Sequence, residues 1–265
     1  MLTTLTSYRL LATNLDASLK RVAEQPQVKR EAEYYLAHIG EIDTIDQFLA
    51  NDRIYRFAMK ASGLEDMIYA KAFMRKVLEE GISSPDSFAN KLDDGRFRAF
   101  ARRFNFKDFG PTATTFERAR QQVVDDYVRL TLEEQAGEQD EGVRLALYLQ
   151  RKAPGIRNGY DMLADKTLLK IAETMLGYSL LHGDIDKHAK AVEKALDIPH
   201  LQEPGKLDKL LTRFAAMWEM RNGGGLPGLT GSAGQAANAL LVQPLSAGVS
   251  QDVLLTLQTL KITGR

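Results

Sequence analysis

The sequence of 265 residues contains no cysteine, which excludes disulfides, thiolate metal sites, iron–sulfur clusters and cysteine nucleophiles. It also lacks net charge, because 35 Lys and Arg residues balance 35 Asp and Glu residues, so no global field attracts nucleic acid or anionic lipid. The first residues, MLTTLTSYRLLATNL, lack the features of a signal peptide, and no run approaches the ~18–20 apolar residues of a transmembrane helix. We expect a protein without a membrane span that is cytoplasmic or exported by a signal-less route.

Signals for β-strands are also scarce. The chain has no alternating run of Val, Ile or Thr, and neither Asn-Gly pair lies between such runs. Apolar residues instead recur at helical spacing, as Leu11, Leu15, Leu19 and Val22 do. We therefore predict an all-α fold, an irregular multi-helix array. Its clearest helices are expected over 65–81, 159–176, 184–196 and 205–221, with one long or two successive helices over 116–154 and a break near Gly137 or Gly142.

The composition changes after residue 222. Between Gly223 and Arg265 lie eight of the 20 glycines, and the charged side chains there are only Asp252, Lys261 and Arg265. We predict a helical repeat-like domain over 1–222, followed over 223–265 by a Gly-rich linker and a short amphipathic C-terminal helix. The tail's apolar residues, which either pack back on the domain or bind a partner, include Leu240, Leu241, Val253, Leu257 and Leu260.

Three segments share a pattern that predicts a repeated helix–corner–helix unit. Each has an apolar residue, a possible helix cap two positions later, and a large-small apolar face at offsets 5, 8 and 9. The separations of 43 and 71 residues are unequal, which argues against a regular solenoid. The alternative is that unrelated amphipathic helices converge on one pattern. The caps are Asn51, Asp94 and Asp165, and the faces are Ile54, Phe57, Ala58, then Phe97, Phe100, Ala101, then Leu168, Ile171, Ala172.

Charged residues beside two of these caps predict local ion pairs. Asp52 lies four residues before Arg56, and Asp94 lies four residues before Arg98, a spacing that brings side chains together on a helix. Such exposed pairs contribute only ~0.3–0.5 kcal/mol each, so they help a helix to begin and do little more.

The motifs of common enzyme classes are absent. The chain has no GxGxxG, GxxxxGK[ST], HExxH or GxSxG motif and no EF-hand loop. The segment HGDIDKH offers possible metal ligands in His182, Asp184, Asp186 and His188. In the alternative interpretation Asp184 caps the next helix and Asp186 lies in its first turn, where the helix dipole favours acidic residues. We expect no cofactor, no metal and no catalytic residue.

A basic cluster interleaved with phenylalanines follows the second predicted cap. It contains Arg96, Arg98, Arg102 and Arg103, a composition that proteins binding single-stranded nucleic acid use. Such binding requires exposed rings, whereas the phenylalanines here belong to the predicted core. We therefore interpret the arginines as a partner surface or a plain charged surface, and we expect no nucleic acid binding.

The stretch FLANDRIYRFAMKASGLEDMIYAKAFMRKVLEEGISSPDSFANKLDDGRFRAFARRFNF resembles a family called domain of unknown function 1217 (DUF1217). GVRLALYLQRKAP and DMLADKTLLKIAETMLG resemble its second half, so the similarity covers most of residues 1–222. The resemblance implies a helical, non-enzymatic protein of alphaproteobacteria that is often encoded among flagellar genes. It implies no particular catalytic or binding residues.

Together these observations predict a non-enzymatic structural or adaptor protein. The resemblance suggests an association with flagellar assembly or function through protein–protein contacts, and a location in the flagellum after export by a flagellar-type route. The candidate partner surface combines the four arginines of residues 96–103 with the apolar residues of the tail. The alternative is a metal-dependent enzyme or ligand-binding protein that uses the His182–His188 segment.

Overall fold

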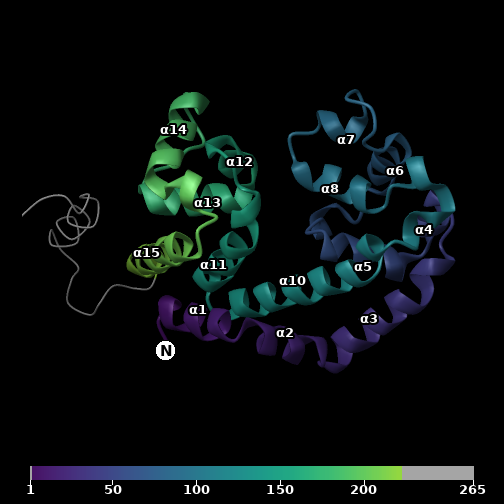
Figure 1. Ribbon diagram of the computed structural model, residues 1–265, viewed down its shortest axis with the longest axis horizontal. Coiled ribbons are helices and arrows are strands. Elements are labelled where there is room, and N and C mark those ends of the chain that lie inside the picture. Colours follow the sequence, from purple (N-terminus) through teal and green to yellow (C-terminus); the bar gives the residue numbers. More distant parts are fainter. Residues whose placement is uncertain (1, 223–265) are drawn as a thin grey trace, which may run out of the picture. The chain divides into compact units, whose positions relative to one another are not determined.

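The computed structural model describes residues 2–222, and these residues form helices and no strand (Figure 1). The α-helices are α1 Thr4–Thr13, α2 Leu15–Ala23, α3 Pro26–His38, α4 Ile45–Ala50, α5 Asp52–Ala61, α6 Lys71–Glu80, α7 Phe88–Lys91, α8 Gly95–Arg103, α9 Phe106–Phe109, α10 Gln121–Gln139, α11 Glu141–Lys152, α12 Gly159–Ala164, α13 Lys166–Leu176, α14 Ile185–Leu196 and α15 Pro204–Asn222. Short 3-10 helices lie at Ile39–Glu41, Glu65–Met67, Gly110–Thr114, Glu117–Ala119, Ala153–Gly155 and Ile198–His200.

The prediction of an all-α, multi-helix array is confirmed. The chain divides into two compact units, Met1–Glu219 and Met220–Arg265. The predicted linker and C-terminal helix over 223–265 lie outside the described residues and stay predictions. The same holds for the tail residues of the candidate partner surface, Leu240, Leu241, Val253, Leu257 and Leu260.

Two predicted helices are wrong in extent. In the stretch 65–81 a separate 3-10 helix comes first, and α6 begins only after Ala70, whose φ of −87° and ψ of 48° leave the helical region. In the stretch 159–176 Asp165 has an extended backbone, with φ of −104° and ψ of 119°, and it divides α12 from α13. This second division agrees with the repeated unit, which places a cap at Asp165.

In the stretch 116–154 a separate 3-10 helix at Glu117–Ala119 comes first, so α10 begins later than predicted, at Gln121. α10 and α11 then meet at Asp140, between the two predicted glycines. The backbone of Asp140 is extended, with φ of −154° and ψ of 109°. Its carboxylate accepts hydrogen bonds from the backbone N–H of Gly142 at 2.8 Å and from the hydroxyl of Thr4 at 2.6 Å. Gly142 leaves room for α15, because a Cβ at this position would lie 2.2 Å from Cδ1 of Trp218.

The repeated helix–corner–helix unit is confirmed at its three predicted places. The side chains of Asn51, Asp94 and Asp165 each accept a hydrogen bond from a backbone N–H in the first turn of α5, α8 and α13. Side chains of this kind stabilise the ends of helices, where the first N–H groups have no helical partner. The nine predicted face residues are all buried, and a short helix, α4, α7 or α12, precedes each corner.

The buried side chains of the first unit form two hydrophobic cores. The first core takes side chains from α2 through most of α10 and is rich in rings: Tyr35, Phe48, Tyr55, Phe57, Phe97, Phe100, Phe104 and Phe106. The second core takes side chains from the end of α10 through α15 and is mainly aliphatic, with Val143, Leu145, Leu147, Leu149, Ile171 and Val192 among its members.

Helix α10 and the N-terminal helices belong to both cores. Leu132 near the middle of α10 is part of the first core, and Ala136 one turn later is part of the second. In the N-terminal helices Tyr8 is buried in the second core and Val22 in the first, while Leu11 packs against both. The apolar stripe predicted near the N terminus therefore completes the folded unit.

Candidate interaction surfaces

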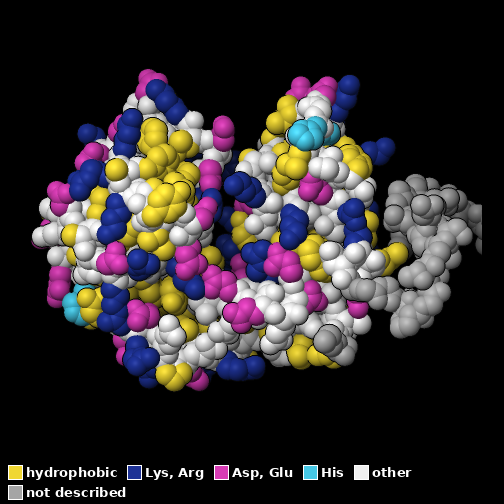
Figure 2. All heavy atoms as spheres, turned by 180° about the vertical axis from the view of Figure 1, so that it is seen from behind, with side chains coloured by type: hydrophobic (Ala, Val, Ile, Leu, Met, Phe, Trp, Pro, Cys, Tyr) yellow, Lys and Arg dark blue, Asp and Glu magenta, His cyan; other side chains and the backbone are white. Residues whose placement is uncertain are grey.

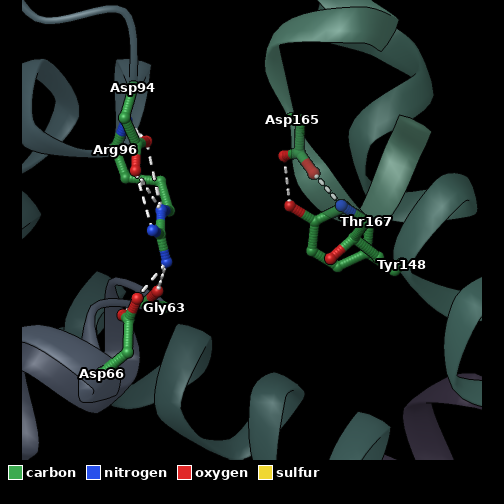
Figure 3. A network of polar contacts seen from close by, with 7 residues as sticks. All are labelled: Gly63, Asp66, Asp94, Arg96, Tyr148, Asp165 and Thr167. Carbon is green, nitrogen blue, oxygen red and sulfur yellow. Dashed lines mark hydrogen bonds and ion pairs between the residues drawn. The ribbon is translucent and has the colours of Figure 1, made fainter. Parts of the chain in front are cut away.

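One arginine of the predicted partner surface serves the fold. Arg96 is half-buried, and its guanidinium lies 2.7 Å from the carboxylate of Asp94 and 3.3 Å from that of Asp66. It also donates a hydrogen bond to the carbonyl oxygen of Gly63 (Figure 3). Burial alone would raise the pKa of Asp94, but hydrogen bonds from the side chain and backbone of Arg96 lower it. We call these contacts the Arg96 network.

The other three arginines differ in exposure. Arg103 is paired with Asp126 of α10 and is mostly buried. Arg98 is exposed and donates a hydrogen bond of 3.2 Å to the carbonyl oxygen of Asn90, and Arg102 is also exposed. Of the predicted cluster, Arg98 and Arg102 are therefore the members placed to meet a partner.

Of the two predicted ion pairs, one forms and one does not. Asp52 lies inside α5, and its carboxylate meets Arg56 at 2.6 Å, as the helical spacing predicts. Asp94 lies before α8 as its cap, with φ of −75° and ψ of 104°, so helical spacing does not apply to it. The predicted pair between Asp94 and Arg98 is wrong, because the carboxylate is held by Arg96.

The His182–His188 segment contains the loop before α14 and its first turn. The carboxylate of Asp184 accepts hydrogen bonds from the backbone N–H groups of Asp186 at 3.0 Å and Lys187 at 3.2 Å. The interpretation of Asp184 as a helix cap is confirmed. Within residues 2–222, no three His, Asp or Glu side chains are grouped so that they could hold a metal ion.

Large apolar side chains are exposed in and around the same loop. They are Tyr160 (46% exposed), Tyr178 (48%), Leu181 (68%) and Ile185 (59%), and we call them the apolar rim. The hydroxyl of Tyr160 donates a hydrogen bond of 2.7 Å to the carboxylate of Asp186, which fixes the ring beside the first turn of α14. The rim was not predicted from the sequence, although Leu181 lies in a loop between α13 and α14, where no helical face requires an apolar residue.

A second polar network lies on α11 and at the start of α13, opposite the Arg96 network in the close view (Figure 3). The hydroxyl of Tyr148 donates a hydrogen bond to one carboxylate oxygen of Asp165, and the other oxygen accepts from the backbone N–H groups of Thr167 and Leu168. Burial and then the charge of Asp165 raise the pKa of Tyr148, so its hydroxyl remains a donor.

Buried charges join α10 to α11. The carboxylate of Glu133, with a side chain only 5% exposed, accepts hydrogen bonds from Arg151 at 2.7 and 2.8 Å and from Arg129 at 3.2 Å. Burial disfavours the charged form of Arg151, but the bonds and charge of Glu133 outweigh it and raise the guanidinium pKa. Both carboxylate oxygens of Glu133 therefore accept hydrogen bonds from arginines.

The fold and its surfaces define an all-α, multi-helix protein with exposed apolar and cationic side chains. A family model described as "Protein of unknown function (DUF1217)" matches residues 61–207, which is more than half of the chain. The chain belongs to this family, and the resemblance noted in the sequence is confirmed.

The fold is similar to a crystal structure of a protein from Agrobacterium tumefaciens, determined by a structural genomics consortium. The two chains are 48% identical and superpose with a TM-score of 0.77, over 84% of this chain and 97% of the other. No curated protein matches the chain. In the part of the chain that the structure describes, no helix is long and apolar enough to cross a membrane.

Proposed function

We propose that the protein is a non-enzymatic structural or adaptor protein that acts through protein–protein contacts. The apolar rim supports this proposal most directly. Apolar side chains that are exposed together characterise partner-binding surfaces more than scattered ones do, and aromatic residues are enriched in such interfaces. The contact between Tyr160 and Asp186 orders one ring in advance, which reduces the entropy lost when a partner covers it.

The cellular setting that we propose is the flagellum. This part of the proposal is supported by the family, whose resemblance implies genes that lie among flagellar genes. The exposed arginines Arg98 and Arg102 are a second candidate contact, suited to an acidic partner surface.

The test is photo-crosslinking in cells of the native bacterium. A photoreactive amino acid replaces Leu181 in the rim, and in a control chain it replaces Lys190, an exposed residue of α14 outside the rim. We expect a discrete adduct with a flagellar component from position 181 and a much weaker one from position 190. Leu181→Asp should also reduce recovery of that component with affinity-tagged protein, because a carboxylate is costly to bury in an apolar interface.

Each outcome addresses a separate part of the proposal. A discrete adduct with a protein outside the flagellum would support the adaptor role and overturn the flagellar setting. If position 181 gave no more adduct than position 190, and Leu181→Asp changed no recovered protein, the rim would not be the partner surface and the adaptor proposal would lose its support.

A further inference from the structure

The loop that contains Leu181 is held at both of its ends. At its start the carboxylate of Glu173 accepts hydrogen bonds from the hydroxyl of Ser179 at 2.9 Å and from the backbone N–H of Leu180 at 2.8 Å. The side chain of Leu180 is buried in the second core. At its other end the loop runs into the capped first turn of α14. Between these two anchors lie residues 181–183, which we call the loop tip.

One side chain supports the loop tip. Gly183 has a φ of 125°, in the region that favours glycine, and a Cβ at this position would lie 3.2 Å from both Cε1 and Nε2 of His188. The imidazole ring on α14 therefore lies directly against the backbone of the loop tip. Residues 182–187 are exposed, whereas His188 is half-buried, as this contact requires.

The contact between His188 and the loop tip is one of packing. Within residues 2–222, no hydrogen bond or ion pair involves the ring of His188, so the ring acts through its shape. Apart from the chain neighbours of Gly183, only atoms of His188 would lie within 4 Å of a Cβ there. Removing the ring would therefore leave this side of the loop tip without support from the folded unit.

The segment HGDIDKH thereby accounts for much of the geometry of the apolar rim. Leu181 precedes the segment and is 68% exposed, and Ile185 lies within it and is 59% exposed. Figure 2 shows hydrophobic and histidine side chains next to one another at the end of the part that contains the second core (top right). Two residues that resemble metal ligands in the sequence instead hold the rim: Asp186 binds the hydroxyl of Tyr160, and His188 packs on the loop tip.

We propose that His188 is a positioning residue of the partner surface: its ring holds Gly183, and through it Leu181, in the orientation that the partner meets. This proposal rests on the adaptor role of the rim. A surface that is ordered before binding loses less conformational entropy when a partner covers it. The partner therefore gains affinity from a side chain that it does not need to touch.

Backbone order parameters from NMR relaxation of the full chain test the first step. For the amides of the loop tip we expect values of about 0.8 in the wild type, close to those of a rigid backbone, and below about 0.6 in His188→Ala. His188→Phe should restore the wild-type values, because it supplies a flat ring without the nitrogens. His182→Ala changes the exposed histidine of the same segment and should leave the values unchanged.

Photo-crosslinking from position 181 tests the second step. His188→Ala should lower the yield of the partner adduct by about fivefold or more, because the loop tip must then be ordered on binding, and His188→Phe should restore it. Gly183→Ala tests the same contact from the other side, since its Cβ meets the ring. Gly177→Ala is the matched control: it also places alanine at a positive φ, but its Cβ would meet no atom within 4 Å.

Three results would overturn the proposal. The first is a set of order parameters for the loop tip that is equal in the wild type and in His188→Ala. The second is an adduct yield that stays at the wild-type level when the loop tip loses its order, in which case the adaptor role stands and only the positioning role fails. The third is the absence of any adduct from position 181 in the wild type, which overturns the adaptor role and this proposal together.

Discussion

The two hydrophobic cores contain the same structural unit but fill it with different side chains. In the first core, the rings of Phe48 and Phe104 lie 4.9 Å apart, as do those of Phe100 and Phe104. In the second core, the residue equivalent to Phe100 in the repeated unit is Ile171, which packs among aliphatic side chains. The capped corner therefore fixes where a large apolar side chain points, and the surrounding helices decide which shape fits.

The largest expected effect comes from removing that central side chain. Phe100→Ala should lower the free energy of unfolding by about 3–5 kcal/mol, because it removes a fully buried ring and leaves a cavity. Ile171→Ala, at the same position of the unit in the second core, should cost about 2–5 kcal/mol. Urea unfolding followed by circular dichroism measures both values.

The same curves show whether the two cores unfold together. Because α10 contributes to both, we expect one transition in each variant. Two separated transitions, with Phe100→Ala shifting one and Ile171→Ala the other, would show that the cores are independent. A cost below about 1 kcal/mol at either position would contradict the proposed equivalence of the units.

A smaller effect is expected from changing two glycines that are the first residues of capped helices, Gly159 of α12 and Gly95 of α8. Gly159 begins α12, where a Cβ would lie 2.2 Å from the backbone oxygen of Ala189. Gly159→Ala should therefore force α12 and α14 apart, at a cost of about 1–3 kcal/mol. Gly95 begins α8, where a Cβ would meet no atom within 4 Å, so Gly95→Ala is the matched control.

The control variant Gly95→Ala should leave the free energy of unfolding unchanged or raise it, since alanine restricts the unfolded chain more than glycine does. Thermal unfolding of both variants tests the contrast. Equal changes in Tm would mean that the close contact of α12 with α14 is relieved at no cost, and that the packing of these two helices is more adaptable than the short backbone distance indicates.

The sequence predicted the fold class and the repeated unit because both depend on local patterns. A cap followed by an apolar face places Asn51, Asp94 and Asp165 correctly without any knowledge of tertiary contacts. The start of α6 was mispredicted because the residues of the stretch 65–70 have helical composition, while the backbone turns at Ala70. Such a turn is a tertiary outcome that composition does not encode.

The candidate sites were less predictable because they depend on residues far apart in the sequence. The spacing of Asp94 and Arg98 suggested an ion pair, but the carboxylate of Asp94 is bound by Arg96 instead. The guanidinium of Arg96 also contacts Asp66 and Gly63, about 30 residues away in the sequence.

The smallest expected effect separates the cap of Asp94 from its charge. Asn caps helices about as well as Asp, so Asp94→Asn should keep the cap and lose the ion pair with Arg96. The pKa of Asp94 in the folded protein lies below its ordinary value, so the ionised carboxylate stabilises the fold above that ordinary value. This contribution is lost as the pH falls through the lowered pKa.

The free energy of unfolding of wild type and Asp94→Asn should therefore differ by less than about 1 kcal/mol at pH 7, since Arg96 is partly solvated and keeps Asp66. The difference should shrink toward zero in acid, where the wild-type carboxyl is also neutral. Asp93→Asn, at the adjacent exposed residue, should track the wild type throughout. A difference that persisted unchanged in acid would mean that the cap geometry, and not the charge, distinguishes Asp94, as it does at Asn51 in the same core.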